Sequence, residues 1–337
     1  MGFKPCRGTT KTLQSPPLYE FPPGARQYLP RDGYHGRIFS YRHAFHAGNH
    51  ADVLKHMVLV ATLQHLLQKP AALMVVDTHA GAGLYRLDDD YAGTSGEAAE
   101  GIVKLLADPP AAPAPALADY LETVRSFNRE GRLKLYPGSP FVVQKFLREE
   151  ARDKLKLFEM HPTDSQALAA HVAQLKAGRQ VSVTRADGFE SLKALLPPPS
   201  RRGLVLIDPS YEIKSDYAKV SACIQDSLKR FSTGTYAVWY PIIPRPEAHD
   251  LPRRLKTLAQ QAGKPWLHAT LAIGQRDEPV QPLVPGEAPR RPGLTASGMF
   301  LVNPPHTLKA ALAPALPQLL EVLGRGRGQG QALESAG

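Results

Sequence analysis

Short apolar runs alternate with segments of helical periodicity through most of the chain, and this alternation predicts an α/β fold. Strands are expected at residues 71–77, 155–159, 181–185, 204–207, 235–240, 267–273 and 298–302. Their mostly apolar composition is typical of parallel strands that are covered on both faces. Because helical segments separate most of them and the last two form a close pair, the pattern predicts a doubly wound sheet of about seven strands with a hairpin-like addition at its end.

The helical segments carry their own start signals. Asn49 is expected to cap a helix over residues 50–68, in which apolar residues recur at helical spacing and His56 lies on or near the buried face. Further helices are expected at residues 141–150, 163–176, 189–195, 215–231, 249–262 and 306–322.

Proline and glycine divide the chain into a main body and several irregular segments. Residues 1–37 are basic, rich in proline and without periodicity, which predicts a disordered basic N-terminal extension. Prolines also interrupt residues 88–138 between two helical stretches, so this segment is interpreted as a helical insertion. Residues 274–296 are expected to form a long mobile loop, and residues 324–337 a flexible tail.

The strongest chemical signal lies in residues 203–212, which read GLVLIDPSYE. A proline cannot donate to a sheet ladder, so the strand ends at Asp208 and the next residues form a loop at its carboxyl end. In open α/β sheets, ligands bind at such loops. The Asp208 carboxylate, the Pro209 carbonyl and the Tyr211 ring therefore form an acceptor pair beside a stacking ring. This set suits a flat base that carries an amine.

Several predicted strands end in an acid, and these are Asp77, Glu159, Asp187 and Asp208. The first is followed by the glycine-rich turn THAGAG, but Arg86 stands where a dinucleotide fingerprint needs its third glycine. One such acid alone is more simply a strand terminator or a helix cap. Because the carboxyl ends of adjacent parallel strands face one crevice, four acids and a glycine turn together favour a nucleoside-containing ligand.

The histidines are better explained by hydrogen bonding than by a metal. His43, His46, His50 and His56 lie close together in sequence, yet no cysteine accompanies them and the first three fall on irregular chain, so no metal is expected. His56 and His79 are interpreted as hydrogen-bonding groups that line the crevice, the alternative for each being a structural role. No P-loop and no G-x-S-x-G elbow occurs in the sequence.

The net charge of the chain indicates a class of binding partner. Lys and Arg number 41 against 31 Asp and Glu, giving a formal charge of +10, which favours a polyanion such as nucleic acid, although solubility alone would also account for it. Two distant cysteines are typical of a reducing cytoplasm. No apolar run approaches the roughly 20 residues that span a bilayer, so no membrane partner is expected.

The loop at 208–211 resembles the Asp/Asn-Pro-Pro-Tyr/Phe signature of adenine-N6 methyltransferases. Such enzymes must activate a weakly nucleophilic amine, and acceptors on both of its hydrogens do so. Together with SYRHAFHAGNHADVLKH at 40–56, DTHAGAG at 77–83, YPGSP at 136–140 and TASGM at 295–299, the loop makes the chain similar to the bacterial RlmJ (YhiR) family over about residues 38–305.

The resemblance implies a Rossmann-like class I methyltransferase domain over residues 38–323. The implied reaction uses S-adenosylmethionine to methylate adenine N6 in large-subunit (23S) ribosomal RNA, on an unpaired or flipped base in protein-free RNA or an early assembly intermediate. The protein is expected to be a cytoplasmic monomer, and the resemblance implies that the helical insertion faces RNA. Asp208 is the implied catalytic residue, and Tyr41, Pro209 and Tyr211 are expected to contact the substrate. The implied cofactor contacts are His56, His79, Ser139, Glu159, Asp187, Gly188 and Asp208.

Two departures from the family pattern stand out. Ser210 replaces the second proline of the signature, which predicts a less stiff loop and affects rate more than function. Family chains usually begin close to Ser40, so residues 1–37 are interpreted as an upstream start-site error rather than a lineage-specific arm. The competing functions are methylation of adenine in DNA, RNA binding by a decayed methyltransferase, and a nicotinamide-dependent dehydrogenase, which the missing third glycine disfavours.

Overall fold

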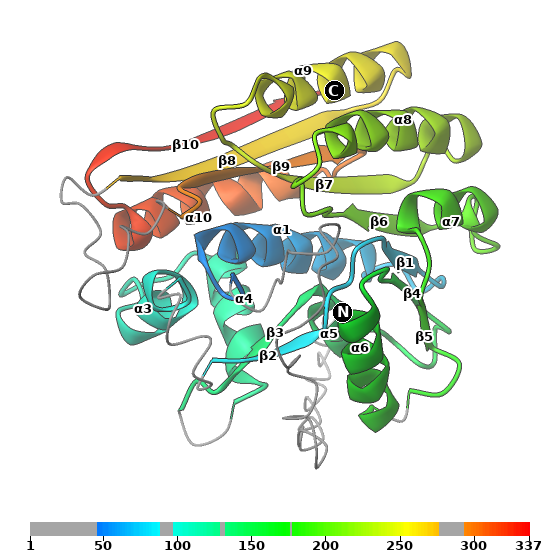
Figure 1. The fold of residues 1–337 in the computed structure, drawn as a ribbon, viewed down its shortest axis with the longest axis horizontal. Coiled ribbons are helices and arrows are strands. Elements are labelled where there is room, and N and C mark those ends of the chain that lie inside the picture. Colours follow the sequence, from blue (N-terminus) through cyan, green and yellow to red (C-terminus); the bar gives the residue numbers. More distant parts are fainter. Residues whose placement is uncertain (1–45, 88–96, 129–131, 176, 276–292) are drawn as a thin grey trace, which may run out of the picture.

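The computed structural model describes residues 46–87, 97–128, 132–175, 177–275 and 293–337. Within these ranges, eight strands form one sheet in the order β10-β8-β9-β7-β6-β1-β4-β5 (Figure 1). Neighbours from β5 to β7 pair in parallel, whereas β8, β9 and β10 are antiparallel. The strands are β1 (Met74–Asp77), β4 (Lys154–Phe158), β5 (Val181–Thr184), β6 (Gly203–Ile207), β7 (Thr235–Pro241), β8 (Trp266–Gln275), β9 (Ala296–Val302) and β10 (Arg327–Ala336). The predicted doubly wound sheet is confirmed.

Helices cover both faces of this sheet. They are α1 (His50–Leu66), α5 (Ser139–Phe146), α6 (Pro162–Gln174), α7 (Gly188–Leu195), α8 (Ser215–Arg230), α9 (Pro246–Gln261) and α10 (Leu308–Leu323). One apolar cluster joins α1, α5 and α10 to one face, and a second joins α7, α8 and α9 to the other. Successive residues of β6 alternate between the two, with Leu204 and Leu206 in the first and Val205 and Ile207 in the second. Both faces of the sheet are therefore shielded from water, which explains the continuous apolar runs in the sequence.

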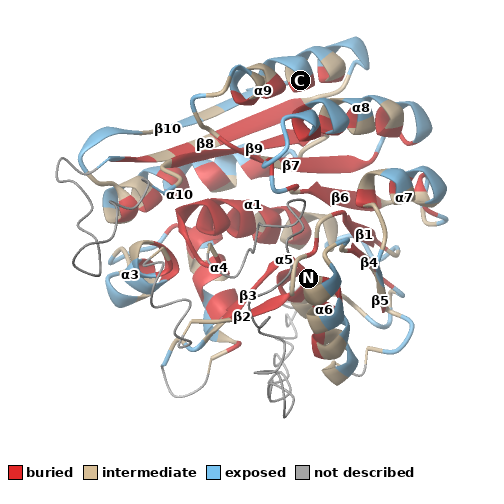
Figure 2. Cartoon of the chain, in the orientation of Figure 1, coloured by how far each residue is buried: buried red, intermediate tan, exposed pale blue. Residues whose placement is uncertain are grey.

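Helix α1 is the central helix of the molecule. Asn49 caps it as predicted, because its side chain accepts hydrogen bonds from the backbone N–H groups of Ala51 and Asp52. Most of the helix is buried (Figure 2). Its buried residues include His56 and a lysine, Lys55. A helix that is buried all round lies inside a core rather than on its surface. Its polar residues must consequently find partners within the protein.

Residues 97–137 contain the helical segment that the sequence predicts as an insertion. It comprises the helices η3 (Ala99–Val103), α3 (Lys104–Ala107) and α4 (Pro115–Arg125) and the short strand β3 (Leu135–Pro137). Strand β3 pairs with β2 (Leu84–Arg86), which precedes the segment. The helix is kinked at Gly101, which has the non-helical angles φ −115° and ψ −111°. A Cβ there would lie 2.2 Å from the Gly48 carbonyl oxygen, so this close approach requires a glycine. Ile102 N–H donates to that same carbonyl at 2.8 Å. The segment is thereby fastened to the beginning of α1.

The C-terminal segment corrects one prediction. Residues 324–337 were expected to form a flexible tail, but Arg327–Ala336 form β10 along the outer edge of the sheet (Figure 1). The strand pairs with β8 from Arg327 opposite Gln275 to Ala336 opposite Trp266. The sequence there is rich in glycine and poor in strand-forming side chains, so the pairing rests on the backbone groups that β8 offers at the edge.

Other predictions fall on parts of the chain outside these ranges. Residues 1–37, Tyr41 and residues 276–292 of the expected mobile loop lie outside the described residues. In the part of the chain that the structure does describe, no helix is long and apolar enough to cross a membrane.

Candidate active site

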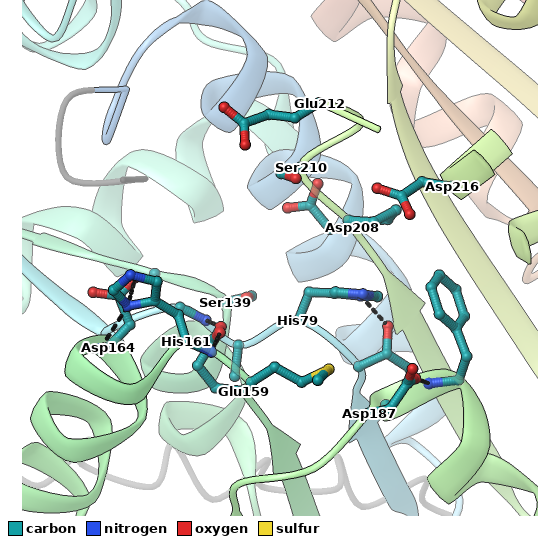
Figure 3. Close-up of a pocket in the computed structure, with 18 of the residues that line it drawn as sticks. His79, Ser139, Glu159, His161, Asp164, Asp187, Asp208, Ser210, Glu212 and Asp216 are labelled. Carbon is teal, nitrogen blue, oxygen red and sulfur yellow. Dashed lines mark hydrogen bonds and ion pairs between the residues drawn. The ribbon is translucent and has the colours of Figure 1, made fainter. Parts of the chain in front are cut away.

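A pocket of about 350 Å³ opens at the carboxyl ends of β1, β4 and β6 and beside the start of α7 (Figure 3). Its volume is within the range of roughly 300–1,000 Å³ typical of small-molecule sites. All residues predicted to contact the cofactor line it, namely His56, His79, Ser139, Glu159, Asp187, Gly188 and Asp208. Pro209 also lines it. Segments that are far apart in the sequence thus meet at the sheet edge that the strand pattern indicated.

Asp77, at the end of β1, supports the glycine-rich turn that follows it. It is fully buried and does not line the pocket, but its carboxylate accepts a hydrogen bond from the Ser139 hydroxyl at 2.6 Å and from His79 N–H at 3.2 Å. Burial raises the pKa of Asp77 to about 6, although both hydrogen bonds oppose this rise. Gly81 and Gly83 have φ values of +59° and +83°, the left-handed region that glycine tolerates best.

His79 is uncharged at neutral pH, because burial lowers its pKa to about 4. The Thr78 hydroxyl donates its only hydrogen to the Leu206 carbonyl at 3.0 Å and lies 2.8 Å from His79 Nδ1. The hydroxyl must therefore accept from Nδ1–H, which leaves Nε2 as a hydrogen-bond acceptor.

Glu159 follows β4 and is held by the backbone on both oxygens. Gly81 N–H donates to Oε2 at 2.8 Å, and His161 N–H donates to Oε1 at 2.7 Å. Burial raises the pKa of Glu159, and the two hydrogen bonds counteract that rise. Each carboxylate oxygen keeps a further lone pair. The geometry suits an acceptor of two vicinal hydroxyls, such as those of a ribose.

Asp187 follows β5 and caps α7. Its Oδ1 accepts from Phe189 N–H at 2.8 Å and Glu190 N–H at 3.3 Å, so the turn is stiff. A Cβ on Gly188 would lie 2.2 Å from the Thr78 carbonyl oxygen. Only glycine allows the start of α7 to approach the β1 turn so closely.

Asp208 lies at the end of β6 and is paired with a residue that the sequence argument did not single out. Lys55 Nζ donates to Asp208 Oδ2 at 2.6 Å and lies 2.8 Å from Asp52 Oδ1. Its side chain is 4% exposed. Burial alone would lower the pKa of Lys55, but the two carboxylates outweigh that effect and raise it. Lys55 is therefore a buried cation that orients Asp208.

Comparison with known proteins identifies the family. A family profile described as "Ribosomal RNA large subunit methyltransferase D, RlmJ" matches residues 70–333. "Ribosomal RNA large subunit methyltransferase J" of Escherichia coli (strain K12) is 42% identical over 284 residues, which cover 84% of this chain and 93% of that protein. The protein of the same name from Haemophilus influenzae is 39% identical over 287 residues, covering 85% and 94% respectively. The chain belongs to the RlmJ family.

A crystal structure supports this assignment. A protein from Legionella pneumophila matches with a TM-score of 0.70 and 31% sequence identity, covering 86% of this chain and 98% of that one. The fold expected of an RlmJ member, a class I methyltransferase sheet, is confirmed.

In this RlmJ chain, Tyr211 does not occupy the place predicted for it. Its side chain is 1% exposed and lies in the apolar cluster beneath α8 and α9, outside the pocket lining. Its hydroxyl donates to the Trp239 carbonyl at 2.7 Å, and its φ is +55°. The prediction that its ring stacks on a base is wrong for this structure, because the backbone turn directs the ring into the core.

The pocket is acidic. Six carboxylates line it, against the two ammonium groups of Lys55 and Lys219; the acids are Glu159, Asp164, Asp187, Asp208, Glu212 and Asp216. Figure 3 shows Asp208, Glu212 and Asp216 on one side and Glu159 and Asp187 on the other. Such a field favours a cationic ligand over an anionic one. Among the described residues, no group of three or more His, Cys, Asp or Glu is arranged to hold a metal ion.

Proposed function

We propose that this protein transfers a methyl group from S-adenosylmethionine to the N6 amine of an adenine in 23S ribosomal RNA. The observation that carries the proposal is the position of Asp208-Pro209, which line the same pocket as Glu159 and Asp187. Membership of the RlmJ family and the names of the two relatives support the rRNA substrate. The signature-like loop supports adenine N6 as the acceptor.

The pocket residues fit S-adenosylmethionine. Its cationic sulfonium suits the excess of carboxylates, and its ribose hydroxyls suit the doubly held Glu159. We assign its binding to His56, His79, Ser139, Glu159, Asp187 and Gly188, together with Asp208. When bound, it supplies an electrophilic methyl group.

The two carboxylate oxygens of Asp208 have different hydrogen-bonding roles. Lys55 holds Oδ2, which leaves Oδ1 to accept a hydrogen bond from the adenine amine. The Pro209 carbonyl accepts from the other amine hydrogen, and the amine lone pair is then released from the ring. With the donor bound, the N6–carbon bond would form as the methyl carbon–sulfur bond breaks, and one N6 proton would be lost to water. The carboxylate also stabilises the positive charge that develops on nitrogen. Because Lys55 fixes the carboxylate in advance, little reorganisation is needed at the moment of reaction.

A base inside a helix cannot reach the end of β6, so the target adenine is unpaired or flipped out. We propose that Tyr41, which lies outside the described residues, contacts the RNA near the pocket mouth. The formal charge of +10 supports a polyanionic partner, although the pocket itself is acidic. The contacts to phosphate are consequently assigned to surfaces away from the pocket.

The test is a methyl-transfer assay on protein-free ribosomal RNA from cells that lack the enzyme, with N6-methyladenosine measured by mass spectrometry after nuclease digestion. Wild type is expected to transfer one methyl group per RNA. Asp208→Ala is expected to lose at least about 100-fold in rate. An inactive wild type would refute the function, and a duplex DNA substrate methylated faster than RNA would favour the DNA alternative.

A further inference from the structure

The loop that follows Asp208 contains an unfavourable backbone conformation. Tyr211 has a φ of +55°, a left-handed conformation in which a bulky residue clashes with its own backbone. Such a conformation persists only where surrounding contacts enforce it. This residue lies three positions after Asp208, in the stretch where Ser210 replaces the second proline of the signature.

The orientation of the Pro209 carbonyl depends on this stretch. That carbonyl belongs to the peptide plane between Pro209 and residue 210, and a proline at 210 would fix φ on the far side of the plane. Serine leaves that rotation free. Asp208 is held separately by Lys55, but the second acceptor of the proposed amine site needs another constraint.

Three contacts supply a constraint at the next residue, Tyr211. The Tyr211 hydroxyl donates to the Trp239 carbonyl at 2.7 Å, and its ring lies against Tyr217 with centroids 4.6 Å apart. On the backbone side, Arg245 Nη1–H donates to the Tyr211 carbonyl oxygen at 3.1 Å. The side chain of Tyr211 is therefore held by β7 and α8, and its carbonyl by the residue that precedes α9.

Arg245 is itself presented by a stiff segment. It stands between Pro244 and Pro246, with φ −126° and ψ 133°, the extended conformation that a residue before proline adopts. Its N–H donates to the Ile243 carbonyl at 2.7 Å, and Pro246 then begins α9. The backbone that carries this guanidinium is therefore more constrained than that of an ordinary loop.

We propose that Arg245 is a positioning residue for methyl transfer, which clamps Tyr211 and thereby supplies the stiffness that a second proline would give at position 210. The proposal rests on the proposed function. In this proposal Tyr211 fixes the conformation of the loop and does not stack on the base. The loop tolerates Ser210 because the next residue is held in place.

Arg245 could instead bind an RNA phosphate, and the two roles differ in what they change. Loss of a phosphate contact raises the KM for RNA and leaves kcat unchanged. Loss of the clamp misplaces an acceptor and lowers kcat at unchanged KM for both substrates.

The experiment compares wild type with Arg245→Ala, Arg245→Lys, Ser210→Pro and the Arg245→Ala/Ser210→Pro double variant. Arg253→Ala is the matched control, because Arg253 lies in α9, shortly after Arg245, is 73% exposed and contacts only nearby residues of its own helix, His249 and Asp250. Arg245→Ala is expected to lower kcat about 10- to 100-fold. Arg245→Lys should retain most of the rate, since a lysine can also donate to the carbonyl. Ser210→Pro should raise kcat far more in the Arg245→Ala background than in wild type.

Hydrogen exchange of the peptide covering residues 208–214 gives a readout that does not need activity. Exchange there should be faster in Arg245→Ala and return toward wild type in the double variant, while Arg253→Ala leaves it unchanged. Unchanged exchange and unchanged kcat in Arg245→Ala, or Ser210→Pro effects that are equal in both backgrounds, would overturn the clamp. A wild type without methyl transfer would instead refute the function, and the exchange data would still decide the clamp.

Discussion

Replacing Lys55 with methionine would leave two carboxylates side by side in the core. Lys55 Nζ lies 2.6 Å from Asp208 and 2.8 Å from Asp52, and the exposed fractions of the three side chains are 4%, 12% and 2%. Methionine keeps the length of the apolar stem but removes the charge. Because only one partner of the cluster is removed, the remaining charges stay buried without compensation.

The magnitude follows from that burial. Removing one partner of a buried ion pair costs about 3–5 kcal/mol in the free energy of unfolding. For a chain of this size, such a loss lowers the melting temperature by roughly 5–10 °C. Asp208 also loses its orientation, so we expect kcat to fall at least about 100-fold.

Urea unfolding at several pH values measures the effect. The carboxylates raise the pKa of Lys55 above its ordinary value, so its contribution is complete below about pH 10.5 and is lost only above that. Wild type is therefore expected to be more stable than Lys55→Met throughout the range from pH 6 to 9.

Lys193→Met is the matched control. Lys193 Nζ lies 2.6 Å from Glu190, the same distance as in the buried pair, but both side chains are about half exposed or more. Water screens such a pair, and we expect no resolvable change in unfolding. If Lys55→Met were as stable as wild type, or if both variants lost stability equally, burial of the cluster would not be the decisive factor.

Three further predictions test other parts of the site and fold. Gly188→Ala should abolish cofactor binding in calorimetry, because its Cβ would lie 2.2 Å from the Thr78 carbonyl oxygen, whereas Gly330→Ala, which meets nothing within 4 Å, should bind normally. Burial raises the pKa of Asp77 to about 6, so its contribution to the free energy of unfolding should fall by about 2 kcal/mol as pH rises from 4 to 7. Asp77→Asn should lack this pH dependence of the free energy of unfolding, and an equal dependence in the variant would contradict the assignment. Amides of residues 327–336 that pair with β8 should exchange slowly, and exchange at unfolded-chain rates would support a flexible tail instead.

Much of the site could be predicted because its signals are local in sequence. An acid that follows an apolar run is placed at a strand end, and parallel strands bring their carboxyl ends to one edge, so Glu159, Asp187 and Asp208 converge. Asn49 could be recognised as a cap because it bonds to N–H groups two and three residues away. The resemblance to the RlmJ family, carried by short motifs in consistent order, added the reaction and the cofactor.

The residues that were missed or misplaced depend on contacts distant in sequence. Lys55 is buried together with its partner Asp208, which is 153 residues away in the sequence. Helical periodicity alone does not reveal such a charge pair inside a core. Tyr211 turned inward because Trp239 and Arg245 hold it, although the signature suggested a ring facing the base. The C-terminal strand formed because the edge of β8 was free, while its own glycines indicated disorder.

Periodicity and residues adjacent in the chain thus sufficed to predict most of the strands and helices and the sheet edge at which ligands bind, and short motifs shared with the family added eight of the residues that line the pocket. The tertiary structure alone decided the electrostatic environment of Asp208, the stiffness of the loop after it and the last strand of the sheet. Those features arise where segments separated by 28 to 153 residues come into contact, and no local pattern encodes such a contact.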